Sequence, residues 1–203
     1  MDERFANLKK IPKDPARRLL ALANAKLVTP LESPAAAPVG TVLAELAGKG
    51  AHGDMLRLLA AALPARECIW WGCLAAGDLV ADDAPMPRPL AAARAWVFKP
   101  TEESRAAAQA ALETADADDE TTLCANAVVM CDGKLGLGDL SALDAPAGAL
   151  GTFIFGQNVK SLASSTAETV EARATLLVDR ALDIARGGSG RLNTAGASEG
   201  IAP

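Results

Sequence analysis

Residues 64–77 read PARECIWWGCLAAG, a stretch whose composition predicts a helix. Ala and Leu are strong helix formers, Pro64 can occupy the first turn, and Gly77 can end the helix. The preceding residues 54–63 carry Leu and Ala at the spacing of one helical face. Because the connection between the two segments is short, we expect them to form a helical hairpin.

The same periodicity recurs on both sides of this hairpin, whereas the β-branched and aromatic residues typical of strands are scarce. Residues 39–47 have the apolar stripe of a helix that is packed on one side. The sequence predicts an all-α fold, a single globular bundle of about seven to nine short-to-medium helices with a flexible C-terminal tail. Besides those already named, helices are expected over residues 14–27, 90–98, 101–115, 120–131, 149–163 and 166–187.

Three of these helices carry capping signals at their expected N-termini. Asp14 followed by Pro15 is typical of an N-cap and a first helical position. Thr101 can cap a helix whose first turn is acidic. Ser165 and Glu168 have the spacing of a capping box, so we expect the last helix to begin there.

Changes in composition divide the chain into three parts. Residues 1–38 hold a basic N-terminal helix and a Pro-rich linker, and residues 39–187 form the helical domain. Residues 188–203 are mostly Gly, Ser, Ala and Asn, which cannot offset their ordering entropy by burial. We therefore expect a disordered tail there.

The chain of 203 residues has no Tyr and a single histidine, His52, which we expect at a helix start or in a loop. One histidine cannot build a His-rich metal site, and a Ser/His/Asp or Cys/His pair would have to use it. Proteins that bind single-stranded nucleic acid stack its bases on several exposed aromatic side chains. Three Trp and four Phe barely supply a core, so we do not expect such stacking surfaces here. The sequence predicts no cofactor, no metal and no nucleic-acid partner.

Charge is unevenly distributed along the chain. The formal net charge is −5, yet residues 1–18 sum to +3 and the remainder to −8. The apolar run at residues 19–23 is shorter than the core of a signal peptide, and no stretch approaches the length of a membrane span. We therefore expect a cytoplasmic protein, without a membrane span, whose four cysteines are reduced.

Neither the cysteines nor the Gly-rich segment at residues 131–139 has the spacing of an established site. Cys68 and Cys73 are five residues apart and Cys124 and Cys131 seven, unlike zinc ligands or redox pairs. The Gly-rich segment lacks the residue order of a phosphate-binding loop or a calcium loop. We interpret the thiols as core residues and the glycines as a helix end followed by a turn.

Two of the three tryptophans, Trp70 and Trp71, are adjacent. Neighbouring helical positions differ by about 100°, so both side chains cannot enter the same pocket. One should anchor the core, and the other should reach a neighbouring helix, a partner or water. A buried aromatic cluster with Trp96 and Phe98 is the structural alternative. Interface hot spots favour Trp and Arg. The candidate partner-binding residues are Arg66, Trp70, Trp71, Arg94 and Trp96.

Three segments together resemble a family of small, Ala-rich, all-helical bacterial proteins described as a domain of unknown function. They are ARECIWWG at residues 65–72, AWV with Pro100 and RAAA at residues 95–108, and RALDIARG at residues 180–187. The resemblance spans roughly residues 64–187. It implies an accessory or adaptor role linked to type VI secretion genes and brings no catalytic residues.

The sequence favours a non-enzymatic accessory, adaptor or chaperone-like protein that binds another protein through a helical surface. One alternative is an enzyme using carboxylates such as Glu67, Asp132 and Asp139 in a cleft beside the Gly-rich loop. Another is an acidic immunity or effector-binding protein whose charge attracts a basic partner.

Overall fold

The structure, a computed structural model, describes residues 3–192, and this part of the chain contains nine α-helices, two short 3-10 helices and no named strand. The all-α prediction is therefore confirmed. The elements are η1 (Glu3–Phe5), α1 (Ala16–Leu22), α2 (Val39–Gly48), α3 (His52–Ala62), α4 (Ala65–Gly77), α5 (Arg88–Phe98), α6 (Glu102–Glu113), α7 (Thr122–Val129), η2 (Gly138–Ala142), α8 (Ala149–Ala163) and α9 (Val170–Arg186).

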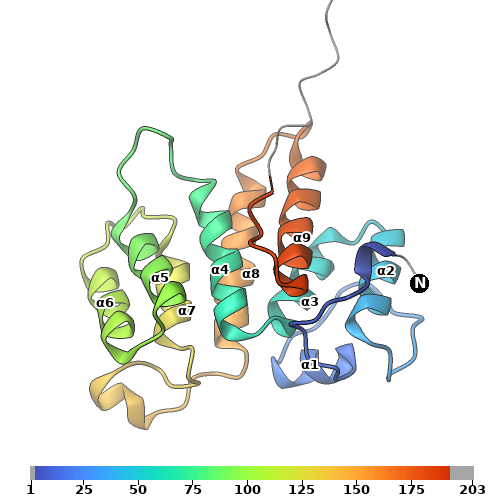
Figure 1. Ribbon diagram of the computed structural model, residues 1–203, viewed down its shortest axis with the longest axis horizontal. Helices are drawn as coiled ribbons and strands as arrows, with labels where there is room; N and C mark the ends of the chain where they lie inside the picture. The colour runs from blue at the N-terminus through green and yellow to red at the C-terminus, as the bar shows by residue number, and fades with distance from the viewer. Residues whose placement is uncertain (1–2, 193–203) are drawn as a thin grey trace, which may run out of the picture.

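Helix α4 lies in the middle of the molecule and contacts α5, α7, α8 and α9 (Figure 1). On one side of it, α5, α6 and α7 pack against one another. On the other side, α3 contacts α1, α2, α8 and α9. None of the helices within residues 3–192 combines the length and apolarity required to cross a membrane.

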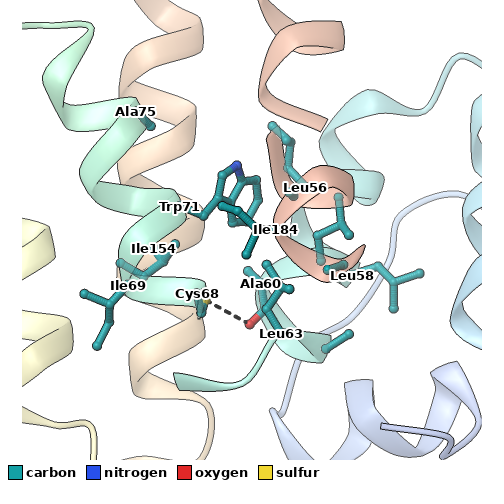
Figure 2. Close-up of a cluster of buried hydrophobic side chains, with 14 of the residues drawn as sticks. Leu56, Leu58, Ala60, Leu63, Cys68, Ile69, Trp71, Ala75, Ile154 and Ile184 are labelled. Carbon is teal, nitrogen blue, oxygen red and sulfur yellow. Dashed lines mark hydrogen bonds between the residues drawn. The ribbon is translucent and has the colours of Figure 1, made fainter. Parts of the chain in front are cut away.

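The core between α3, α4, α8 and α9 is built around Trp71 (Figure 2). This side chain is fully buried, and its Nε1 donates a hydrogen bond of 2.9 Å to the carbonyl oxygen of Leu177. Beside it, the Cys68 thiol donates to the carbonyl oxygen of Ala60 at 3.6 Å. The buried indole N–H of Trp71 and the thiol of Cys68 therefore both have a partner, which limits the penalty of burying them.

The N-terminal segment contributes to this same core. Phe5, Ile11 and Leu20 are buried, and the backbone amide of Lys10 donates to the carbonyl oxygen of Ala185 at 2.8 Å. The Arg186 guanidinium also donates to the carbonyl oxygens of residues 4 and 6. Residues 4–10 are thereby held against the end of α9.

Two of the expected helix starts are wrong, and local hydrogen bonds explain why. Ser165 and Glu168 do not form a capping box: the Ser165 amide donates to the carbonyl oxygen of Leu162 at 3.1 Å, and the Glu168 carboxylate accepts from the Thr166 hydroxyl at 2.9 Å. Helix α9 consequently begins at Val170 rather than near residue 166. Helix α1 has Pro15 at its N-cap, one residue later than expected.

Helix α1 is also shorter than the expected range of residues 14–27. It ends at Leu22, and Asn24 adopts a left-handed conformation with φ of 47°. Asn tolerates this conformation better than most residues do, so the helix stops there. The Thr101 cap is confirmed, since its hydroxyl accepts from the Ser104 amide at 3.2 Å.

Glu45 on α2 fastens the Pro-rich linker to the bundle. Its carboxylate accepts from the backbone amides of Glu32 and Ser33 at 2.6 and 2.9 Å and from the Lys49 ammonium at 2.8 Å. The Lys49 side chain, the Ser33 hydroxyl and the Glu32 amide lower the pKa of Glu45 to about 2. The ionised form is thus favoured in the folded state.

Replacing Glu45 by Gln should remove a stabilising contribution that depends on pH. The folded-state pKa lies below the unfolded value of about 4.3, so the contribution is complete above the unfolded pKa and is lost as the pH falls toward 2. Urea midpoints of the wild type and Glu45→Gln should therefore differ most near neutral pH and converge on acidification. Glu113→Gln, at the exposed end of α6, controls for loss of a carboxylate. A difference in urea midpoint between the two proteins that stays constant with pH would contradict this account.

Glycine at position 151 permits α8 to approach α3. A β-carbon there would lie 2.8 Å from the carbonyl oxygen of Ala60, a backbone atom that cannot swing away. Gly151→Ala should destabilise the fold by about 1–3 kcal/mol, measured by urea unfolding. Gly53→Ala in α3 meets nothing within 4 Å and should be neutral or stabilising. If both variants lost the same free energy of unfolding, the close approach of α8 to α3 would not be the cause of the destabilisation.

Candidate functional site

A groove of about 580 Å³ lies where the start of α4 meets the ends of α5 and α9. Figure 1 shows these three helix ends on the same side of the molecule. We call it the Trp70 groove. Its lining residues are Lys10, Arg66, Glu67, Trp70, Val97, Phe98, Ile184, Gly187, Gly188, Ser189 and Arg191.

The floor of the Trp70 groove is aromatic. Trp70 and Phe98 meet edge to face, with ring centroids 5.8 Å apart and an interplanar angle of 62°. Phe98 is 67% exposed even though its ring has this aromatic neighbour. The groove therefore offers an apolar contact surface to a ligand.

Cations surround this floor. The Arg66 Nε donates to the carbonyl oxygen of Val97 at 2.6 Å, which ties α4 to the end of α5. Arg191 lies over the Trp70 ring, with its Cζ 5.2 Å from the ring centroid. Lys10 forms an ion pair of 3.0 Å with Glu67. Three cations and one carboxylate thus line the groove.

One wall of the groove is the segment that follows α9, residues 187–192, which we call the C-terminal strap. Gly187 has φ of 103°, a left-handed conformation that lets the chain reverse at the helix end. The amide of Gly190 donates to the Asp183 carboxylate at 2.8 Å, and the Trp70 indole donates to the carbonyl oxygen of Ser189 at 2.7 Å. The strap therefore packs on the bundle as far as residue 192, and the rest of the predicted tail, residues 193–203, lies outside the described residues.

The structure brings together two of the five candidate partner-binding residues. Arg66 and Trp70 line the groove, whereas Trp71 is fully buried and Trp96 is only 7% exposed. Arg94 faces the second half of α4, where it donates to the carbonyl oxygen of Cys73 at 3.4 Å. Trp71, Trp96 and Arg94 therefore support the fold rather than line the groove.

Among the groove residues outside the candidate set are one aromatic side chain, Phe98, and two cations, Lys10 and Arg191. Phe98 is the last residue of α5, where the Lys-Pro pair that follows ends the helix and leaves its side chain exposed. Lys10 and Arg191 lie in the segments interpreted as a basic arm and a disordered tail. Only the helix-ending position of Phe98 gives a sequence signal for exposure, since the other two positions depend on long-range contacts.

The three carboxylates of the enzyme alternative lie on separate elements with different partners. Glu67 pairs with Lys10 in the groove. Asp132 accepts from the buried Arg105 at 2.6 and 2.7 Å, and Arg105 also donates to the carbonyl oxygen of Val129 at the end of α7. Asp139 lies in the exposed helix η2. Asp132 therefore has a structural function in holding the Gly-rich loop to α6.

The cysteines have the surroundings of core residues. Burial raises the pKa of the Cys68 thiol, and the neighbouring Cys73 thiol together with burial raises that of Cys124 well above its usual range. Burial also raises the pKa of Cys131. Such thiols are poor nucleophiles. Within residues 3–192, no group of three or more His, Cys, Asp and Glu side chains is arranged to hold a metal ion.

The fold and the groove define a small all-α protein with an aromatic and basic groove at one end of its central helix. Residues 42–185 match DUF6931, a family of unknown function, and the chain belongs to this family. No curated protein and no solved structure matches the chain. The family region includes Arg66, Trp70 and Phe98, whereas Lys10 and Arg191 are contributed by the flanking segments.

Substituting Phe for each adjacent tryptophan should separate the groove from the core. Trp71→Phe should lower the free energy of unfolding by roughly 1–3 kcal/mol, because it opens a cavity and removes a buried hydrogen bond. Trp70→Phe should change stability much less and should instead release the strap, seen as faster hydrogen exchange at the Gly190 amide. Identical effects of the two variants on both measurements would argue against this division.

Proposed function

We propose that this protein is a non-enzymatic accessory or adaptor protein that binds another protein at the Trp70 groove. The observation that carries the proposal is the 67% exposure of Phe98 beside Trp70, in a groove bordered by arginines. Trp, Phe and Arg at a concave surface are typical of interface hot spots. The proposed setting is cytoplasmic, as the cysteines suggest, and the family resemblance adds a link to type VI secretion genes.

Preformed geometry supports this proposal. The Arg66 contact to Val97 fixes the end of α5, and the Trp70 contact to Ser189 fixes the strap. Both contacts hold groove walls in place before any ligand arrives. A preorganised surface loses less conformational entropy on binding, so more of the contact energy is available for affinity.

The alternative functions draw less support from these side chains. Asp132 is engaged by Arg105 and Glu67 by Lys10, so neither is poised as a free general base. A basic partner at the Trp70 groove would meet Arg66 and Arg191, which would repel it.

Site-specific crosslinking would test the proposed function in cells. A photoreactive phenylalanine analogue placed at position 98 should crosslink one discrete protein in the native host. The same analogue at position 28, where Val28 is 87% exposed on the loop after α1, serves as the control. The product at position 98 should disappear when Arg191→Glu is added, because that change alters the groove and spares the core.

Two results would contradict the proposal. One is a set of products at position 98 that equals the set at position 28. The other is a product that is unaffected by Arg191→Glu and by a second groove variant, Trp70→Phe. Thermal unfolding of each variant establishes that the bundle itself is intact.

A further inference from the structure

The Trp70 groove has apolar and charged features that together specify a ligand. Its floor is the edge-to-face pair of Trp70 and Phe98, and Val97 adjoins it. The exposed face of Phe98 can accept one apolar side chain of a ligand, which would be removed from water there. A volume of about 580 Å³ accommodates a short stretch of peptide.

The cations at the edges of this floor have unused hydrogen-bonding capacity. Arg66 uses its Nε on the Val97 carbonyl oxygen, and neither Arg66 nor Arg191 forms an ion pair with any residue that the structure describes. Lys10 and Glu67 neutralise each other. The groove therefore carries two uncompensated guanidinium groups, and guanidinium groups favour carboxylates.

The N-terminal segment that contributes Lys10 to the groove is itself basic. Lys9 and Lys13 are exposed on the N-terminal segment next to Lys10, and residues 1–18 have a net charge of +3. The remaining chain sums to −8, so the groove and the adjoining segment differ in sign from the rest of the protein. Charge complementarity at this face selects an anionic ligand.

We propose that the Trp70 groove binds an acidic peptide segment of another protein, in which an apolar side chain packs on Phe98 and flanking carboxylates pair with Arg66 and Arg191. This inference rests on the proposed function and adds the chemistry of the partner. The peptide backbone follows the strap, and Trp70 remains bound to the strap through its indole N–H.

Peptide selection on the full-length protein would test the inference. A phage library of random peptides of about 12 residues is panned against the wild type, with Phe98→Ala as the counter-selection. The selected sequences should combine Asp or Glu with a neighbouring Leu, Ile, Phe or Trp. Fluorescence anisotropy of the labelled peptides should show affinity that falls as salt rises from about 0.05 to about 0.5 M.

Charge variants identify the residues responsible. Arg191→Glu should weaken binding about tenfold or more, and Arg66→Gln should also weaken it. Arg88→Glu is the matched control, because Arg88 is exposed at the opposite end of α5, about 15 Å along the helix from Phe98. This control should bind within about twofold of the wild type.

Each other outcome overturns the inference in a recognisable way. Peptides that depend on Phe98 but are neutral or basic would refute the acidic ligand while leaving the proposed function intact. Acidic peptides that bind Arg191→Glu and Arg66→Gln as well as the wild type would refute the assigned arginines. Self-association lost in Phe98→Ala would make a second copy the occupant. An absence of Phe98-dependent peptides would refute the inference, and the crosslinking experiment would still decide the proposed function separately.

Discussion

Close packing of α4 against α8 is the contact on which the rest of the bundle depends. Gly72 makes it possible, because a β-carbon at that position would lie 2.6 Å from Cδ1 of Ile154, which is itself fully buried. Helix α4 also contacts α5, α7 and α9, so its position sets the spacing of both halves of the molecule (Figure 1). A small residue in the interface between α4 and α8 therefore sets how closely these two helices approach.

The central place of α4 also explains how this one helix contributes to both the core and the groove. Trp71 points into the interior (Figure 2). Its indole N–H donates to the Leu177 carbonyl oxygen on α9. Trp70, about 100° around the helix, faces the strap and Phe98. Both indole N–H groups donate to backbone carbonyl oxygens of the C-terminal part of the chain. The rigid core and the groove wall are consequently anchored through adjacent residues.

The parts of the fold that follow from local patterns could be predicted from the sequence. Helix α8 occupies the expected residues 149–163, and Thr101 caps α6 as its side chain suggests. The capping box expected at Ser165 does not form, because the Ser165 amide donates to the Leu162 carbonyl oxygen at the end of α8 and Glu168 bonds to Thr166. The candidate set from the sequence contains Arg66 and Trp70 of the groove but not Phe98 and Arg191. These two residues join Trp70 through contacts between segments far apart in the sequence. Helical periodicity carries no information about such contacts.

A basic groove on an acidic protein has a consequence for selectivity. At physiological ionic strength the Debye length is about 8 Å, so salt screens the effect of distant carboxylates on a charge in the groove. Arg66 and Arg191 would contact a ligand directly, so their attraction is screened much less. The proposed acidic partner is disfavoured by the net charge of −5 of the whole protein and attracted by the two guanidinium groups of the groove. Negative charge elsewhere thus disfavours other binding modes, which is a source of specificity beyond the direct contacts. The N-terminal segment, fixed to α9 by the Lys10 amide, contributes Lys10 to the lining of this groove.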